Sequence, residues 1–110
     1  RGAGCPEGKS ILGGIKDGME VIIEDGVAKL PDRTSFAGSV ATADRLVRNM
    51  INLAGASLPD AVKMATLTPA RIMGLADRGI LAPGYLADII IFDEQINISK
   101  VLVGGKIIKG

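Results

Sequence analysis

The apolar residues in the first third of the chain follow the spacing of β-strands. Two short apolar runs, at 21–23 and 27–30, lie on either side of Asp25-Gly26. An Asp-Gly pair tolerates the positive φ angles of a type I′ turn, so residues 19–30 are predicted to form a β-hairpin. Pro31-Asp32 is expected to end the second strand of that hairpin.

The middle of the chain changes to a helical spacing. Over 41–54 the apolar residues recur at i, i+1, i+4, i+5 and i+8, which is one face of a 3.6-residue period. This face comprises Leu46, Val47, Met50, Ile51 and Ala54, whereas the other face carries Arg45, Arg48, Asn49 and Asn52. The pattern predicts a helix that Ser39 or Thr42 caps and that Gly55 ends.

Further helical structure is predicted over 58–74. Ser57 can accept a hydrogen bond from an early backbone N–H, and Asp60 favours the positive end of a helix. A third, short helix is expected to follow, with Thr68 as its cap, Pro69 as its first helical residue and Gly74 as its end.

The last third of the chain returns to strands. Residues 89–92 read Ile-Ile-Ile-Phe, and a hairpin closed by Gly104-Gly105 follows. A strand that does not alternate with polar residues needs cover on both faces. We expect that cover to come from a larger protein, and we expect the isolated chain to associate or to remain partly disordered.

Composition bounds the possible partners. The 110 residues allow one domain at most, and 13 basic against 12 acidic residues give a net charge of +1. No nucleic-acid partner and no membrane partner is therefore expected, and no apolar run is long enough to predict a membrane span. The single cysteine, Cys5, excludes an internal disulfide and indicates a cytoplasmic protein. Arg1-Gly2 lacks an initiator Met, and we interpret this end as a cut inside a longer protein.

Residues 3–10 imitate a phosphate-binding loop. They fit a relaxed pattern of a small residue, four others and Gly8-Lys9-Ser10. Such a loop needs a strand before it and a helix after it, so that backbone N–H groups point at the phosphate. Gly13-Gly14 oppose a helix, and Pro6 removes one of the needed donors. We therefore reject nucleotide binding and expect a glycine-rich loop over residues 1–10.

Candidate chemistry is sparse in this sequence. The chain has no histidine, its carboxylates are scattered over turns, caps and strand ends, and Cys5 has no partner for nucleophilic catalysis. The stretch Phe36-Ala37-Gly38-Ser39 lies between the predicted hairpin and the first helix. Free N–H groups before a helix suit a phosphate or a polar sugar, but the same residues also suit a plain loop and N-cap.

Taken in order, these segments resemble the C-terminal part of the N-acetylglucosamine-6-phosphate deacetylase family, within the metal-dependent amidohydrolase superfamily. The matching segments cover nearly the whole chain and include Ser35-Phe36-Ala37-Gly38-Ser39, Asp44-Arg45-Leu46-Val47-Arg48-Asn49, Ser57-Leu58-Pro59-Asp60-Ala61 and Pro83-Gly84 followed by Ala87-Asp88. The first of these segments is similar to the family's Leu-Ala-Gly-Ser substrate loop, with Phe in place of Leu. The last is shared with many amidohydrolases and is less specific.

The resemblance implies an α/β fold, in which residues 1–75 end a (β/α)8 barrel and residues 76–110 supply strands of a small β-sandwich. The barrel part would hold the hairpin 19–30, the substrate loop 35–39 and helices 41–54 and 58–74. As a fragment, the chain is expected to be α+β with two to three helices.

The resemblance also implies the reaction, which is hydrolysis of N-acetylglucosamine 6-phosphate to glucosamine 6-phosphate and acetate. The family holds a divalent metal, Zn or similar, with Glu and His, and an Asp after the eighth barrel strand moves the proton. In the family, the metal ligands and this Asp precede the part that this chain resembles, so none of them carries over to a residue here. This chain alone is therefore expected to be inactive and to bind no metal. Phe36, Ala37 and Gly38 are expected to bind the sugar phosphate, and the full-length form is expected to be a homo-oligomer.

Two other interpretations remain open. The tail fits another amidohydrolase equally well, such as a deaminase or a cyclic-amide hydrolase, although the Phe36-Ala37-Gly38-Ser39 loop fits those poorly. The chain could also be a small α+β interaction domain without catalytic activity, which would require it to fold alone.

Overall fold

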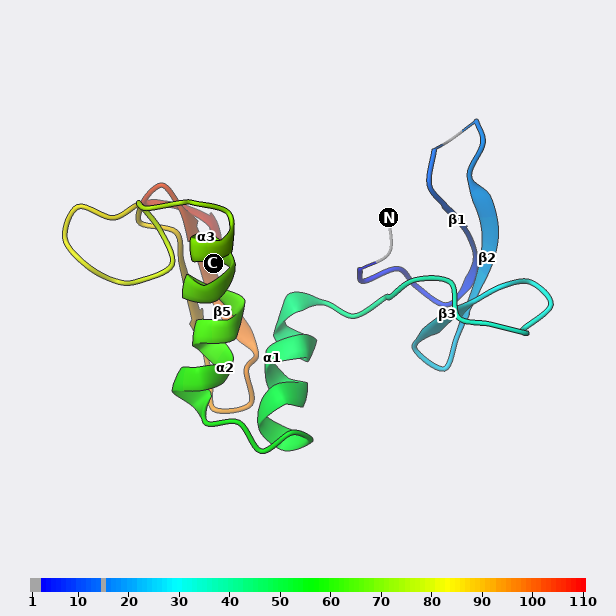
Figure 1. Cartoon of the computed structure of the whole chain (residues 1–110), viewed down its shortest axis with the longest axis horizontal. Helices are drawn as coiled ribbons and strands as arrows, with labels where there is room; N and C mark the ends of the chain where they lie inside the picture. Colours follow the sequence, from blue (N-terminus) through cyan, green and yellow to red (C-terminus); the bar gives the residue numbers. More distant parts are fainter. Residues whose placement is uncertain (1–2, 15) are drawn as a thin grey trace. The chain divides into compact units, whose positions relative to one another are not determined.

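A computed structural model describes residues 3–14 and 16–110 of the chain (Figure 1). It divides into two units, Arg1–Thr42 and Ala43–Gly110. The interpretation of Arg1-Gly2 as a cut end lies outside the described residues. The predicted boundary between residues 1–75 and 76–110 concerns a larger protein and stays a prediction.

The first unit is built on an antiparallel sheet of β1 (Gly8–Leu12), β2 (Met19–Glu24) and β3 (Val27–Lys29), in that order. Asp25 and Gly26 have φ angles of 55° and 68°, so the predicted type I′ turn between β2 and β3 is confirmed. The prediction that residues 1–10 form a loop is wrong for 8–10. These residues pair with residues 21–23 of β2, a contact between distant parts of the sequence that no local signal marks.

The sheet of the first unit has one buried and one open face. Val21 and Ile23 are 3% exposed, and they share their face with Ala28 and Ala37, which are also buried. The residues between them point to the opposite face, because side chains alternate along a strand. The open face includes the ion pair of Lys9 with Glu20, whose Nζ and Oε1 atoms lie 3.2 Å apart.

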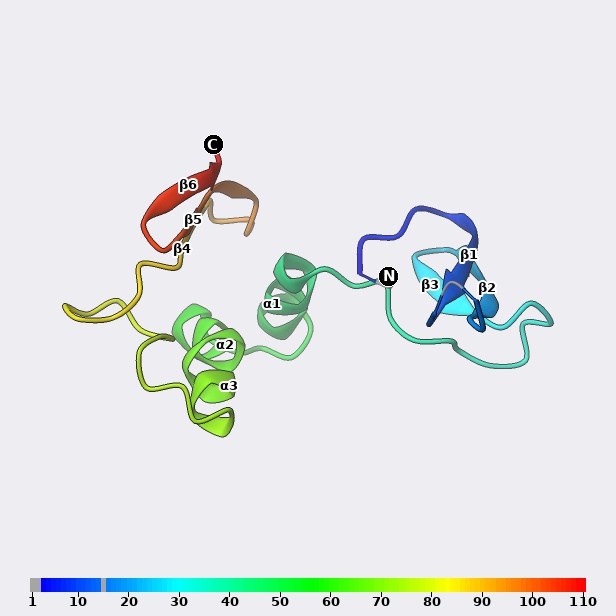
Figure 2. The ribbon, with the colours of Figure 1, turned by 90° about the horizontal axis from the view of Figure 1, so that it is seen from above.

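The second unit begins with α1 (Ala43–Asn52), α2 (Leu58–Ala65) and α3 (Leu67–Ile72). Figures 1 and 2 show α1 beside α2, and α3 directly continuing from α2. The first helix is shorter than the predicted 41–54, and the predicted apolar face is only partly covered, since Leu46 is 55% exposed.

The helix ends test the predicted caps. Ser57 caps α2 as predicted, because its Oγ accepts the backbone N–H of Asp60 at 3.2 Å. Gly74 has a φ of 69° and follows the end of α3, as predicted. Thr68 as the cap of the third helix is wrong. Thr66 holds the N-cap position of α3 and donates its hydroxyl to the carbonyl of Val62 in α2, so the region 58–74 breaks there.

The second unit ends in an antiparallel sheet of β4 (Ile89–Phe92), β5 (Ile98–Val103) and β6 (Lys106–Lys109), whose strands lie next to one another in that order (Figure 2). Gly104 and Gly105 close the β5–β6 hairpin with φ angles of 55° and 78°, as predicted. Ile90 and Ile91 of β4 are each 48% exposed. Within this chain the cover that an apolar strand needs on both faces is therefore incomplete.

The observed fold is α+β, with two separate three-stranded antiparallel sheets and three helices among the described residues. None of the helices in the part of the chain that the structure describes is long and apolar enough to cross a membrane.

Candidate functional site

The predicted substrate loop 35–39 folds back along the edge of the first sheet. Phe36 pairs with Lys29, the last residue of β3, in an antiparallel bridge. The backbone N–H of Ala37 donates to the carbonyl of Ala28 at 2.8 Å. The loop is therefore held by the sheet through backbone hydrogen bonds, and it does not depend on a helix N-terminus for its shape.

The three predicted binding residues differ sharply in exposure and conformation. Phe36 is 77% exposed, whereas Ala37 is buried. Gly38 has a φ of 85°, and a Cβ atom built there would lie 3.7 Å from the nearest carbon of Leu12, an ordinary contact. Glycine is thus needed for its backbone conformation and not for lack of space. The arrangement presents an aromatic ring and a glycine backbone while the residue between them anchors the loop.

A carboxylate with two cations lies beside the loop. Glu24 accepts hydrogen bonds from Nζ of Lys29 and Nε of Arg33, each at 3.0 Å, and from Nη2 of Arg33 at 3.2 Å. These hydrogen bonds, first that of Arg33 and then that of Lys29, hold the pKa of the Glu24 carboxyl below its ordinary value. Glu24 therefore stays ionised at neutral pH and joins the end of β2 to the turn that precedes the loop.

The turn itself is closed by a second carboxylate. Asp32 accepts the backbone N–H of Thr34 at 3.0 Å and its hydroxyl at 2.8 Å, and these two bonds lower the pKa of the Asp32 carboxyl. Next to it is a hollow of about 360 Å³ lined by Lys29, Arg33, Thr34, Ser35 and Phe36. Lys29 and Arg33 are engaged by Glu24, whereas the aromatic ring and the hydroxyls of Thr34 and Ser35 can hold a polar ligand that has an apolar ring face.

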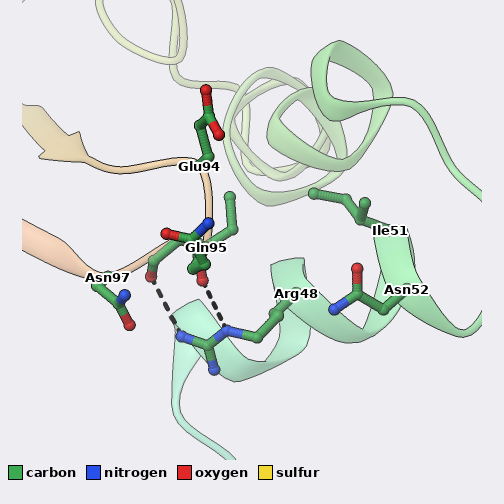
Figure 3. A pocket seen from close by; sticks show the side chains of 7 residues that line it. Arg48, Ile51, Asn52, Glu94, Gln95 and Asn97 are labelled. Carbon is green, nitrogen blue, oxygen red and sulfur yellow. Dashed lines mark hydrogen bonds between the residues drawn. The ribbon is translucent and has the colours of Figure 1, made fainter.

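A second hollow, of about 250 Å³, lies in the other unit between α1 and the β4–β5 turn (Figure 3). Arg48 of α1 reaches across it and donates from Nε to the carbonyl of Gln95 at 2.9 Å and from Nη2 to that of Ile96 at 3.2 Å. Nη2 also lies 3.2 Å from Oδ2 of Asp44. The guanidinium is engaged by the protein, so it joins a helix to a turn and is not presented to a ligand.

The β4–β5 turn is ordered by Asp93. Its Oδ1 accepts the backbone N–H groups of Gln95 and Asn97, each at 2.9 Å, and its Oδ2 accepts the side-chain amide of Asn97 at 2.9 Å. The hydrogen bond from the Asn97 side chain is the largest cause of a lowered pKa for the Asp93 carboxyl. The turn is therefore a rigid acceptor for Arg48.

The described residues do not fit the divalent metal that the resemblance implies. Among residues 3–14 and 16–110 there is no group of three or more His, Cys, Asp or Glu side chains placed to hold a metal ion. Cys5 lies beside Ser10, with Sγ and Oγ 3.4 Å apart. Residues 8–12 form a strand, so the helix that a phosphate-binding loop needs after Gly8-Lys9-Ser10 does not follow these residues.

Sequence reasoning located the loop but missed what surrounds it. Nothing in the local pattern joins Glu24 to Arg33, since the pair depends on how the turn after β3 bends. The interaction of Arg48 with Gln95 was missed as well, because 47 residues separate the two in the chain. The periodicity had placed Arg48 only on the polar face of its helix.

Comparison with known proteins gives one family, with relatives in two groups, the hexosamine-phosphate deacetylases and the adenine deaminases. The profile of the amidohydrolase family matches residues 7–108. The chain is 33% identical over 106 residues to the "Putative N-acetylgalactosamine-6-phosphate deacetylase" of Escherichia coli K12, covering 96% of this chain and 60% of that protein. It is 35% identical over 107 residues to the N-acetylglucosamine-6-phosphate deacetylase of Lysinibacillus sphaericus, covering 97% of this chain and 26% of that protein.

A solved structure matches over almost the whole chain as well. It is a mutant of N-acetyl-D-glucosamine-6-phosphate deacetylase from Mycobacterium smegmatis in complex with N-acetyl-D-glucosamine 6-phosphate. The TM-score is 0.81 at 28% identity, over 98% of this chain and 28% of that one. The adenine deaminase of Methanothrix thermoacetophila is 43% identical, but over 63 residues, 57% of this chain and 11% of that protein.

Proposed function

The chain belongs to the amidohydrolase family, and on this premise we propose that it forms part of an enzyme that deacetylates an N-acetylhexosamine 6-phosphate. The observation that carries the proposal is that known deacetylases align with almost the whole of this chain. The deacetylases of Lysinibacillus sphaericus and Mycobacterium smegmatis align with 97% and 98% of the chain. We propose N-acetylglucosamine 6-phosphate as the substrate, with glucosamine 6-phosphate and acetate as products.

We propose that these residues act within a larger catalytic unit. The chain spans 26% of the Lysinibacillus deacetylase and 28% of the Mycobacterium structure, so most of such an enzyme has no counterpart here. In that setting, residues 1–75 would end a (β/α)8 barrel and residues 76–110 would complete a β-sandwich. Active sites of such barrels lie at the C-terminal ends of their strands. The enzyme would be a cytoplasmic homo-oligomer.

The role proposed for this chain is to bind and orient the substrate. The exposed ring of Phe36 can pack on an apolar sugar face, while Gly38 brings backbone close to the ligand and Ala37 holds the loop to β3. A divalent metal, when bound by such an enzyme, activates water for attack on the acetamide carbonyl. The described residues do not fit that metal, so no step of the reaction is assigned to them.

The experiment is a substrate panel on the protein as its gene encodes it. Acetate release is measured with N-acetylglucosamine 6-phosphate, N-acetylgalactosamine 6-phosphate and unphosphorylated N-acetylglucosamine. We expect release from a phosphorylated sugar and much less from the sugar without phosphate. The galactosamine compound is included because one matched relative carries that name. Absence of acetate from all three sugars would refute the proposed function.

A second candidate is an adenine deaminase, because 63 residues of the chain are 43% identical to such an enzyme. Its weakness is that these residues are only 57% of the chain. The same protein preparation is therefore incubated with adenine, and ammonia is measured. Ammonia release without acetate release from any sugar would favour the deaminase.

A further inference from the structure

The contact between Glu24 and Arg33 joins two parts of the first unit that are nine residues apart. Arg33 approaches the carboxylate with two nitrogens, Nε at 3.0 and 3.3 Å from its two oxygens and Nη2 at 3.2 Å. Lys29 adds a third donor at 3.0 Å. The Glu24 side chain is only 29% exposed. The Arg33 side chain is 57% exposed, so what distinguishes this pair is its fork geometry, which is more directional than a single-contact ion pair.

The backbone of Arg33 is in an unfavourable conformation. Its φ is 61°, in the left-handed region that residues with a Cβ atom rarely adopt. Its N–H donates to the carbonyl of Leu30 at 2.8 Å, which closes the turn. A conformation of this kind persists only where the surroundings hold it in place. Besides that hydrogen bond, the contact of its side chain with Glu24 ties Arg33 to the end of β2.

The turn sets the register of the loop that follows. Leu30 donates its N–H to the carbonyl of Ser35 at 3.0 Å, and one step further Phe36 pairs with Lys29. In this register Ala37 is buried and Phe36 is exposed. A slip by one residue would exchange the two faces, because side chains alternate along a strand. The conformation at Arg33 therefore decides which side chain the loop presents.

We propose that Glu24 is a positioning residue for substrate binding. By holding Arg33 and Lys29 it fixes the turn after β3 in the one register that presents Phe36 and Gly38 to the sugar phosphate. The substrate named in this inference rests on the proposed function, whereas the effect of Glu24 on the register of the loop does not depend on that function.

The test compares Glu24→Gln with Glu20→Gln in the protein as its gene encodes it. Glu20 is a matched control, because it lies on the same strand and pairs with Lys9 away from the loop. With N-acetylglucosamine 6-phosphate, we expect Glu24→Gln to raise KM about tenfold with kcat changed less than about twofold, as loss of uniform substrate binding does. Glu20→Gln should leave both unchanged. A KM for Glu24→Gln equal to that of the control would overturn the proposal.

A second variant guards against a folding defect. Arg33→Gly removes the side chain but suits a φ of 61°, so it relieves the backbone and deletes the contact. We expect the double variant Glu24→Gln/Arg33→Gly to return KM to within about twofold of the wild type, because glycine adopts this φ without a contact to hold it. A double variant with the raised KM of Glu24→Gln alone would show that Glu24 does not act through the backbone of Arg33.

Hydrogen exchange separates this inference from the proposed function. Exchange of the segment 28–37 is followed by mass spectrometry in the wild type, in Glu24→Gln and in Glu20→Gln. Faster exchange in Glu24→Gln alone supports positioning, even if the wild type releases no acetate and the proposed substrate is wrong. Equal exchange in all three proteins overturns positioning, whatever the activity.

Discussion

Ile96 combines burial with an unfavourable backbone, and this makes it the sharpest test of the second unit. Its side chain is 4% exposed and its φ is 61°. A β-branched residue in the left-handed region costs roughly 1–2 kcal/mol. The turn keeps Ile96 there through its N–H, which donates to Asp93 at 2.9 Å, and through its carbonyl, which accepts from Arg48.

The free-energy costs of burial and of backbone strain predict that replacing Ile96 by glycine destabilises the protein no more than replacing it by alanine. Ile96→Ala removes three buried carbons at roughly 0.8 kcal/mol each, so the free energy of unfolding should fall by about 2–3 kcal/mol. Ile96→Gly removes one more carbon and adds backbone entropy to the unfolded chain, a further loss of about 1–2 kcal/mol. It also relieves roughly 1–2 kcal/mol of backbone strain. The glycine variant should therefore be about as stable as the alanine variant.

The assay is equilibrium urea unfolding of the protein as its gene encodes it, followed by far-UV circular dichroism. Ala61→Gly is the control, because Ala61 is 1% exposed in the regular backbone of α2 and should lose about 1–2 kcal/mol. If the step from alanine to glycine costs as much at position 96 as at 61, then the left-handed backbone stores no strain and the reasoning is refuted.

Two further predictions concern a close approach and a carboxylate. At Gly79 a Cβ atom would lie 2.9 Å from the backbone of α3 with φ at 95°, whereas at Gly84, with φ at 87°, it would meet nothing within 4 Å. Gly84→Ala should therefore lower the free energy of unfolding by about 1–2 kcal/mol, and Gly79→Ala should lower it by roughly 1–3 kcal/mol more. The two variants are compared by their thermal unfolding midpoints. Equal midpoints would contradict the clash at position 79. Hydrogen bonds from Arg33, the larger cause, and from Lys29 lower the pKa of the Glu24 carboxyl in the folded protein. The stability that these bonds contribute is therefore fully present above the ordinary pKa of Glu. It is lost as the pH falls through the lower pKa that Glu24 has in the folded protein. Exchange of the segment 28–37, corrected for its intrinsic rate, should accelerate across that acidic range in the wild type. Glu24→Gln should show a smaller step, which comes from Asp32, because the hydrogen bonds from Thr34 lower the pKa of that carboxyl too.

Much of the local structure follows from short stretches of sequence. Asp25-Gly26 and Gly104-Gly105 predict their hairpins because few residues adopt two consecutive positive φ angles, and both pairs do. Ser57 predicts the start of α2 because its hydroxyl can replace a missing backbone partner. The order of the segments also led to the family that the profile match then showed. The binding role of Phe36, Ala37 and Gly38 stays a prediction.

Only the tertiary structure decides how these pieces support one another. The strand β1, the pair of Glu24 with Arg33 and the contact of Arg48 with the β4–β5 turn join residues that no local pattern connects. Local sequence sets backbone propensity, because a residue's φ preference and hydrogen-bonding groups act on near neighbours. Which distant groups meet depends on the path of the whole chain. That path holds Arg33 and Ile96 in conformations that their own propensities oppose.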